Sequence, residues 1–135
     1  MDNQGDKMKI HHMGIIVESI DKSIDIYKQL GYSQISEIFI DNIQHIKIVF
    51  LKSKDNTQTI ELIESLGNIS SIHNFGTGYH HICYDVSDIQ DYTSYFKTLK
   101  IGKIFMKPMI ASALENRQVV FAYLANGTFV EFVIK

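Results

Sequence analysis

The chain contains an internal repeat, and this repeat constrains its fold more than any other feature of the sequence. A shift of 69 positions, from His11 to His80, carries the stretch HHMGIIVESIDKSIDIYKQL onto HHICYDVSDIQDYTSYFKTL. Further along, a shift of 70 positions, from Glu61 to Glu131, carries NTQTIELI onto NGTFVEFV. Two copies of one unit of secondary structure therefore account for most of the chain.

Hydrophobic periodicity predicts the same strands in both copies. Each copy begins with a strand rich in Ile, Val and Tyr and ends with a short strand and a hairpin. The hairpins turn at KDN and at ANG, which are typical turn sequences. The predicted strands are residues 10–17, about 34–40, 45–51 and 56–63 in the first copy, and 79–86, 104–106, 118–124 and 126–133 in the second.

Between the first and second strand of each copy, apolar residues at helical spacing predict one amphipathic helix. Ser19 and Asp88 are the expected N-caps, and Gly31 and Gly102 are expected to follow the helix ends. The remaining long segments, residues 67–78 and 107–117, are expected to be loops. The sequence therefore predicts an α+β fold of tandem βαβββ modules, about residues 9–66 and 78–135, which form curved eight-stranded sheets around a cleft.

Composition limits the possible functions. With 135 residues, 45% of them hydrophobic, the chain can build one core but not two ordinary domains. The formal net charge of −2 is spread along the chain, so we expect neither nucleic acid nor a membrane surface as a partner. The polar N-terminus does not resemble a signal peptide, and no apolar run is long enough to span a bilayer. The single cysteine, Cys83, suits a reducing compartment, so a cytoplasmic location is expected.

The second histidine of each pair is expected to face the cleft. Successive strand residues point to opposite faces, so His12 shares a face with Ile16, and His81 shares a face with Cys83. The other faces carry the larger apolar residues that the helices should cover. Glu61 and Glu131 sit mid-strand between apolar residues that would also pack against the helices.

A carboxylate in the middle of an apolar strand is costly unless it is paired or bound to a metal. A lone buried histidine is usually a hydrogen-bonded core residue, and a lone glutamate usually lies at a sheet edge. Because both types recur at matched positions, we predict that His12, Glu61, His81 and Glu131 bind one divalent transition metal in the cleft. Co²⁺, Ni²⁺, Zn²⁺ and Mn²⁺ all suit this mixture of nitrogen and oxygen ligands.

The other candidate residues have less specific patterns. The first histidine of each pair is expected to support its strand, and His45 and His73 are expected at the surface. Cys83 is expected to be a small residue of the cleft wall rather than a nucleophile, because no catalytic motif accompanies it. Arg117, the only arginine, could anchor a substrate carboxylate or phosphate or could lie on the surface.

At these residues the chain resembles the vicinal oxygen chelate superfamily, whose members duplicate a βαβββ module and bind a metal in the cleft. The resemblance covers nearly all of residues 9–135 and implies a single glyoxalase-like domain over residues 1–135. The stretches IHHMGIIVESIDKSIDIYKQLGY, IELIESL and GYHHICYDVSDI look most like methylmalonyl-CoA epimerases. The stretch IASALENRQVVFAYLANGTFVEFV looks like a small bacterial glyoxalase-like subgroup. The four metal ligands of the family fall on His12, Glu61, His81 and Glu131.

The resemblance implies proton transfer next to the carbonyl of a thioester, with Glu131 or Glu61 as the catalytic base, in an expected homodimer. Two departures bear on the substrate. Glyoxalase I commonly has an arginine four residues after its first ligand, where this chain has Ile16. Epimerases usually carry GAHG-like and HPK sequences, which ALEN and LAN replace here.

Three alternatives to an epimerase remain open. Lactoylglutathione lyase (glyoxalase I) would act on a glutathione hemithioacetal. A non-catalytic antibiotic-binding resistance protein would have the same fold, but such relatives generally lack the metal ligands. Oxygenases and thiol transferases of the superfamily use two histidines and one glutamate, so Glu61 favours a site with four ligands.

Overall fold

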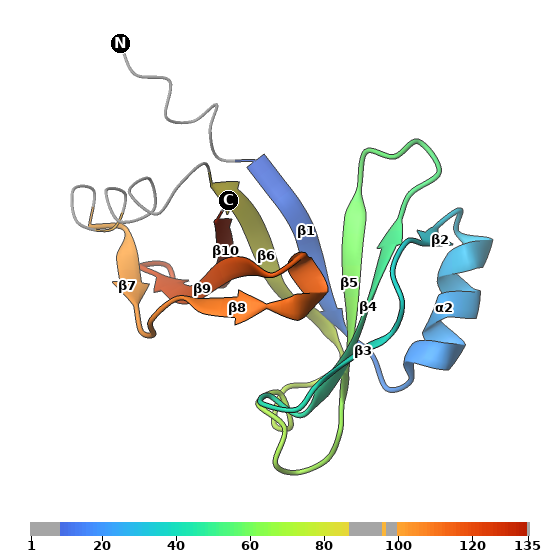
Figure 1. Cartoon of the computed structure of the whole chain (residues 1–135), viewed down its shortest axis with the longest axis horizontal. Helices are drawn as coiled ribbons and strands as arrows, with labels where there is room; N and C mark the ends of the chain where they lie inside the picture. The colour runs from blue at the N-terminus through green and yellow to red at the C-terminus, as the bar shows by residue number, and fades with distance from the viewer. Residues whose placement is uncertain (1–8, 87–95, 97–99, 135) are drawn as a thin grey trace. The chain divides into compact units, whose positions relative to one another are not determined.

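The computed structural model describes residues 9–86, 96 and 100–134, which contain ten strands, one α-helix and one 3₁₀ turn (Figure 1). The chain divides into two compact units. One unit is His12–His80, and the other is His81–Lys135 together with the residues up to His11. The two boundaries fall inside the two histidine pairs, so the units follow the two copies of the repeat.

The first copy has the predicted order of elements. The sheet order is β2-β4-β5-β1, with β3 also paired to β4. β1 and β5 are parallel, and the other pairs are antiparallel. The elements are β1 (Lys9–Ile16), α2 (Ile20–Gln29), β2 (Ser33–Gln34), β3 (Phe39–Asp41), β4 (Ile46–Lys52) and β5 (Thr59–Ser65).

The second copy repeats this topology. The order β6-β10-β9-β7 has a parallel pair, β6 with β10, at the equivalent place, and β8 also pairs with β9. The elements are β6 (Gly78–Val86), β7 (Gly102–Ile104), β8 (Met109–Ala111), the 3₁₀ turn η1 (Ser112–Leu114), β9 (Arg117–Leu124) and β10 (Phe129–Ile134).

Helix α2 begins and ends at the predicted signals. The Ser19 side chain accepts a hydrogen bond from the backbone N–H of Lys22 at 3.3 Å, which caps the first turn. At the other end Gly31 has φ +96° and donates its N–H to the carbonyl of Lys28, a left-handed termination that favours glycine. Of the second predicted helix only Phe96 is described, and it is helical and packs against the core of the second copy; the rest of that helix and its cap at Asp88 lie outside the described residues.

Each copy packs its core on one face of its sheet. In the first copy α2 covers that face, and Ile15 and Val17 pack against the same cluster. The buried residues of the two cores are Ile20, Ile24, Val49, Leu51, Ile60 and Leu62 in the first copy, and Val86, Val120, Ala122, Val130, Phe132 and Ile134 in the second. The predicted alternation of faces is therefore confirmed. The opposite face of each sheet, called the ligand face below, carries His12 and Glu61 in the first copy and His81 and Glu131 in the second.

The single short strand predicted in each copy is interrupted. It appears as β2 and β3 in the first copy and as β7 and β8 in the second, so eight predicted strands become ten. In the first break the Ser36 hydroxyl accepts the N–H of Phe50 at 2.9 Å in place of a backbone carbonyl. The second break contains Pro108, which has no N–H to donate. The segment 107–117, predicted to be a loop, therefore contains β8 and η1. Gly102, which was expected to follow the end of a helix, is the first residue of β7.

The two hairpin turns are built alike. Asp55 accepts a hydrogen bond from the Thr57 hydroxyl, and Asn126 accepts one from the Thr128 hydroxyl, each at 2.7 Å. Because these side chains close the turns, the last strand of each copy begins three residues later than predicted, at Thr59 and at Phe129. The turns therefore repeat at the level of side-chain hydrogen bonds.

Candidate metal centre

In the first copy His12 and Glu61 form a buried pair. The parallel register of β1 and β5 places Gly14 opposite Glu61, and glycine leaves room beside the carboxylate. The distance from His12 Nε2 to Glu61 Oε1 is 3.4 Å. The two residues are only 1% and 6% exposed, so both polar groups are held away from water.

An aromatic ring supports this pair. Phe50 lies opposite Glu61 in the antiparallel register of β4 and β5. The rings of His12 and Phe50 meet edge to face, with centroids 5.2 Å apart and planes at 78°. This packing restricts the orientation of the imidazole.

In the second copy His81 and Glu131 form the equivalent pair. Cys83 lies opposite Glu131 in the parallel register of β6 and β10, and Phe121 lies opposite it on β9. His81 Nε2 and Glu131 Oε1 are 3.0 Å apart, and the two residues are 3% and 5% exposed. The rings of His81 and Phe121 also meet edge to face, at 6.3 Å.

The two pairs therefore repeat one arrangement. In each, a glutamate lies between a small residue on the parallel neighbour and a phenylalanine on the antiparallel neighbour. The histidine stands two residues before the small residue, which is Gly14 in the first copy and Cys83 in the second. Cys83 is fully buried, as expected for a small residue of the site wall.

The donor atoms of each pair suit a divalent transition metal. Imidazole nitrogen and carboxylate oxygen bind such ions at about 2.0–2.2 Å. Two ligands at that distance and at right angles around an ion lie about 3.0 Å apart. The 3.0 Å separation of the second pair equals this value and is also a hydrogen-bond distance, whereas the 3.4 Å separation of the first pair is slightly longer.

Arg117 is held by an ion pair. Its Nη2 donates to Asp85 Oδ1 at 2.7 Å, and the guanidinium also donates to the carbonyls of Val133 and Ile134. The side chains of Arg117 and Asp85 are 23% and 29% exposed. The arginine therefore joins β6, β9 and β10 rather than projecting freely as an anchor.

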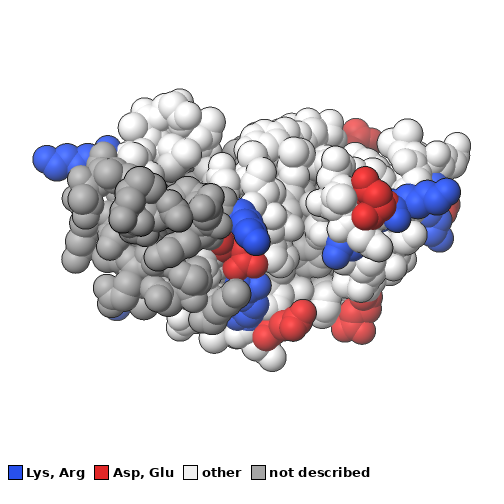
Figure 2. All heavy atoms as spheres, turned by 90° about the horizontal axis from the view of Figure 1, so that it is seen from above, with Lys and Arg blue, Asp and Glu red and all other residues white. Residues whose placement is uncertain are grey.

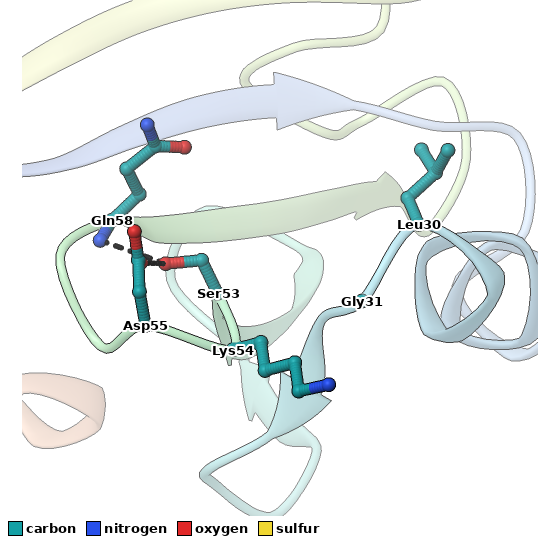
Figure 3. Close-up of a pocket in the computed structure, with 6 residues that line it drawn as sticks. All are labelled: Leu30, Gly31, Ser53, Lys54, Asp55 and Gln58. Atoms are coloured by element: carbon teal, nitrogen blue, oxygen red, sulfur yellow. Dashed lines mark hydrogen bonds between the residues drawn. The ribbon is translucent and has the colours of Figure 1, made fainter.

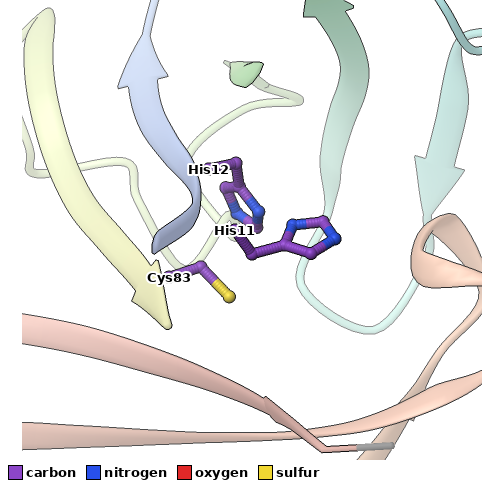
Figure 4. Close-up of side chains that lie close together, drawn as sticks. All are labelled: His11, His12 and Cys83. Carbon is purple, nitrogen blue, oxygen red and sulfur yellow. The ribbon is translucent and has the colours of Figure 1, made fainter. Parts of the chain in front are cut away.

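The remaining histidines differ in their surroundings. Figure 4 shows His11 on β1 and Cys83 on β6, and a ring nitrogen of His11 lies within 4.8 Å of the sulfur. His80 packs edge to face on Phe75, with ring centroids 5.0 Å apart. His73 is exposed as predicted, whereas His45 is half-buried with φ +57°.

The sequence prediction missed the phenylalanines beside the two pairs. Phe50 and Phe121 are ordinary apolar residues in the printed sequence, and their role depends on which residue they face. Counting the antiparallel register outward from each hairpin turn would have placed them opposite Glu61 and Glu131.

A separate surface pocket does not resemble a catalytic site. The pocket, an open hollow of about 480 Å³, lies between the end of α2 and the β4–β5 turn, and Figure 3 shows the residues that line it. Its carboxylate, Asp55, already accepts hydrogen bonds from Ser53 and Thr57. The residues that line the pocket are Leu30, Gly31, Ser53, Lys54, Asp55 and Gln58.

The charge distribution agrees with the sequence prediction. On the face in Figure 2, basic and acidic side chains of the described residues lie interspersed rather than in patches of one sign. Within the described part of the chain, no helix is long and apolar enough to cross a membrane.

Comparison with known proteins identifies the family. Residues 11–121 match the family described as the Glyoxalase/Bleomycin resistance protein/Dioxygenase superfamily. A mitochondrial methylmalonyl-CoA epimerase from Dictyostelium discoideum is 29% identical over 130 residues, covering 91% of this chain and 76% of that protein. The human mitochondrial methylmalonyl-CoA epimerase is 28% identical over 120 residues, covering 85% of this chain and 66% of that protein.

Solved structures confirm the predicted glyoxalase-like fold. A hypothetical protein from Bacillus halodurans C-125 superposes with a TM-score of 0.80 at 28% identity, covering 95% of this chain and 94% of the other. Methylmalonyl-CoA epimerase from Mycobacterium tuberculosis superposes with a TM-score of 0.80 at 22% identity, covering 93% and 86%.

Proposed function

The chain belongs to the glyoxalase/bleomycin resistance protein/dioxygenase superfamily, and on this premise we propose that it is a metal-dependent epimerase. It would move a proton next to the carbonyl of an acyl thioester, as methylmalonyl-CoA epimerase does. The observation that carries the proposal is the pair of matched, buried His–Glu sites, one in each copy of the repeat. The names of the relatives support it, as do solved epimerase complexes with 2-nitronate-propionyl-CoA and with methylmalonyl-CoA.

We propose that His12, Glu61, His81 and Glu131 together hold one divalent ion, Co²⁺, Ni²⁺, Zn²⁺ or Mn²⁺. Each copy supplies one nitrogen and one oxygen donor, and buried carboxylates require a cationic or hydrogen-bonding partner. When bound, such an ion supplies Lewis-acid polarisation of a carbonyl oxygen, which makes the neighbouring C–H bond more acidic.

The two glutamates are the proposed proton carriers. One carboxylate oxygen takes the α-proton, and the electron pair of the broken C–H bond moves toward the carbonyl oxygen. Return of a proton to the opposite face of the α-carbon inverts its configuration. Glu61 and Glu131 come from different copies of the repeat, so the duplication supplies two candidate bases.

Glyoxalase I is the main alternative, and two observations disfavour it. Ile16 is buried on the ligand face, where the glyoxalase pattern has an arginine for the glutathione carboxylate. A charge-assisted hydrogen bond is worth roughly 1.5–3 kcal/mol, so its loss weakens glutathione binding by about one to two orders of magnitude. Arg117, the only arginine in the sequence, forms an ion pair with Asp85.

The metal proposal is tested by elemental analysis of purified variants. We expect about one ion per chain in the unmodified protein and none in His12→Ala or His81→Ala. His45→Ala, half-buried in a turn, is the matched control and should retain the ion. Equal metal content in all three variants would contradict the assignment.

The reaction is tested by exchange of the substrate α-hydrogen with D₂O, using methylmalonyl-CoA and the methylglyoxal–glutathione hemithioacetal with the same metal. We expect a higher kcat/KM for methylmalonyl-CoA and a loss of exchange in Glu61→Gln or Glu131→Gln. A preference for the hemithioacetal would favour glyoxalase I instead. Full rates in both glutamine variants would exclude the glutamates as bases.

A further inference from the structure

Four aromatic side chains form a continuous surface on the ligand face of the second copy. Phe121 lies opposite Glu131, and Tyr123 lies opposite Phe129, which stands two residues before Glu131 on β10. All three therefore share the face of the sheet that carries Glu131. Phe105, just beyond β7, completes the set. We call Phe105, Phe121, Tyr123 and Phe129 the aromatic platform.

The rings of the platform contact one another in sequence. Phe121 and Phe129 are stacked, with centroids 5.2 Å apart and planes at 6°. Phe129 is stacked on Phe105 at 6.0 Å and contacts Tyr123 at 5.3 Å. Phe105 and Tyr123 are 5.4 Å apart. These distances lie in the range of favourable aromatic pairs, so the four rings act as one packed surface.

The platform begins at the candidate metal centre and ends in solvent. Phe121 and Phe129 present their rings edge to face to His81, with centroid distances of 6.3 Å and 6.2 Å. These two phenylalanines are half-buried, whereas Tyr123 is 46% exposed and Phe105 is 50% exposed. An apolar surface thus leads outward from the His81–Glu131 pair.

The platform is not part of the core of the second copy. That core lies on the opposite face of the sheet, where Val120, Ala122 and Phe132 are buried. Single exposed aromatic residues are common, but four contiguous rings that adjoin a buried His–Glu pair are typical of the apolar lining of a ligand site.

We infer that the aromatic platform binds a flat, apolar substituent of the substrate, and that the preferred substrates are thioesters whose acyl group carries an aryl ring. This inference rests on the proposed function, because the α-carbon must lie beside the carboxylate that takes its proton. Phe121 lies opposite Glu131 and Phe129 stands two residues before it, so these rings are the nearest members of the platform to a substituent on that carbon.

The chemistry of the platform selects the substituent. Its residues offer ring faces and edges and, apart from the Tyr123 hydroxyl, no hydrogen-bonding group. A carboxylate placed on Phe121 or Phe129 would lose hydration without gaining a hydrogen bond from these rings, whereas an aryl ring would gain apolar ring contacts. Lys103 lies opposite Tyr123 in the β7–β9 register, so its charge belongs to the outer end of the platform.

The test measures binding of two unreactive thioethers, S-benzyl-CoA and S-methyl-CoA, to the metal-loaded protein by calorimetry. We expect the benzyl compound to bind at least tenfold more tightly than the methyl compound. Phe105→Ala and Phe129→Leu should each reduce this ratio to about twofold or less. Phe75→Ala is the matched control, because Phe75 is also 50% exposed but lies in the segment between β5 and β6, outside the platform, and it should keep the full ratio. Circular dichroism checks that each variant is folded.

The outcomes separate this inference from the proposed function. If both thioethers bind equally, or if the tighter binding of S-benzyl-CoA is unchanged in Phe105→Ala and Phe129→Leu, the inference about the platform is wrong. Neither result contradicts the epimerase proposal. Failure of both thioethers to bind overturns the acyl-CoA proposal and the inference together. Exchange assays add a second readout: the kcat/KM ratio of 2-phenylpropionyl-CoA to methylmalonyl-CoA should fall about tenfold in Phe105→Ala and stay constant in Phe75→Ala.

Discussion

At the scale of single residues, Cys83 shows how closely the two copies match. It occupies the place of Gly14, opposite the glutamate of its copy, and it is fully buried. We predict that Cys83→Leu destabilises the protein by roughly 1–3 kcal/mol through overpacking and also weakens metal binding. Cys83→Ala should have a smaller effect. Urea unfolding and metal titration measure both effects, and loss of activity in Cys83→Ala with metal still bound would instead indicate a catalytic thiol.

Asp55 provides a prediction for pH. Hydrogen bonds from the Ser53 hydroxyl and then from Thr57 lower its pKa from 3.8 to about 2. A folded-state pKa below the unfolded value of about 3.9 stabilises the fold above that pH, and the benefit disappears as the pH falls toward 2. The difference in urea midpoint between the protein and Asp55→Asn should therefore shrink between pH 5 and pH 2.5.

The turn at Asn126 is the equivalent, in the second copy, of the turn at Asp55. Asn126 accepts the same threonine hydrogen bond without titrating, so Asp55→Asn introduces the neutral residue that the second copy already uses. A difference in midpoint that does not change with pH would show that the Asp55 carboxylate does not contribute to acid sensitivity.

At the scale of secondary structure elements, the end of α2 depends on Gly31. Its φ of +96° is a conformation that an L-residue adopts at a cost of roughly 1–2 kcal/mol. We predict that Gly31→Ala lowers the free energy of unfolding by about this amount. Gly76→Ala is the control, because a methyl group there meets open space and φ is ordinary, and it should be neutral. Equal midpoints for the two variants in urea unfolding would contradict the prediction.

Gly102 controls the approach of β7 to β9. A methyl group at this position would lie against the carbonyl oxygen of Tyr123 and 2.7 Å from the Cα of Leu124. Gly102→Ala should therefore displace β7, cost roughly 1–3 kcal/mol in urea unfolding and move Phe105, which follows β7 in the chain. Because Phe105 moves, the ratio of S-benzyl-CoA affinity to S-methyl-CoA affinity should also fall. Retention of both stability and that ratio would show that β7 does not position the platform.

At the scale of the whole molecule, the proposed metal should couple the two copies. An ion that binds only the folded state at 100 times its Kd adds about 2.7 kcal/mol to the free energy of unfolding. If both copies contribute ligands to one ion, His12→Ala and His81→Ala should each abolish the whole increase. Unfolding curves with and without chelator measure this. An increase reduced by half in each variant would indicate two separate sites.

Local patterns predicted much of the fold and candidate site. Alternation along β1 placed His12 on the face opposite Ile15 and Val17, and the same rule placed Glu131 opposite the core face of β10. Caps at Ser19 and Gly31 were correct because capping depends on a few adjacent residues. The interrupted edge strands were missed, because the break depends on bonds such as that from Phe50 N–H to the Ser36 hydroxyl across 14 positions.

The amino-acid sequence by itself determined the duplication, the order of elements in the first copy and the identity of the two His–Glu pairs, because these follow from periodicity and from matched positions. Only the tertiary structure decided which residues face the two His–Glu pairs. Strand register brought Phe50 to Glu61 and Phe121 to Glu131, joined Arg117 to Asp85 across 32 positions, and assembled the aromatic platform from β9, β10 and the residue after β7. Register is set by turns and by the packing of a whole sheet face, so no short stretch of the chain contains it.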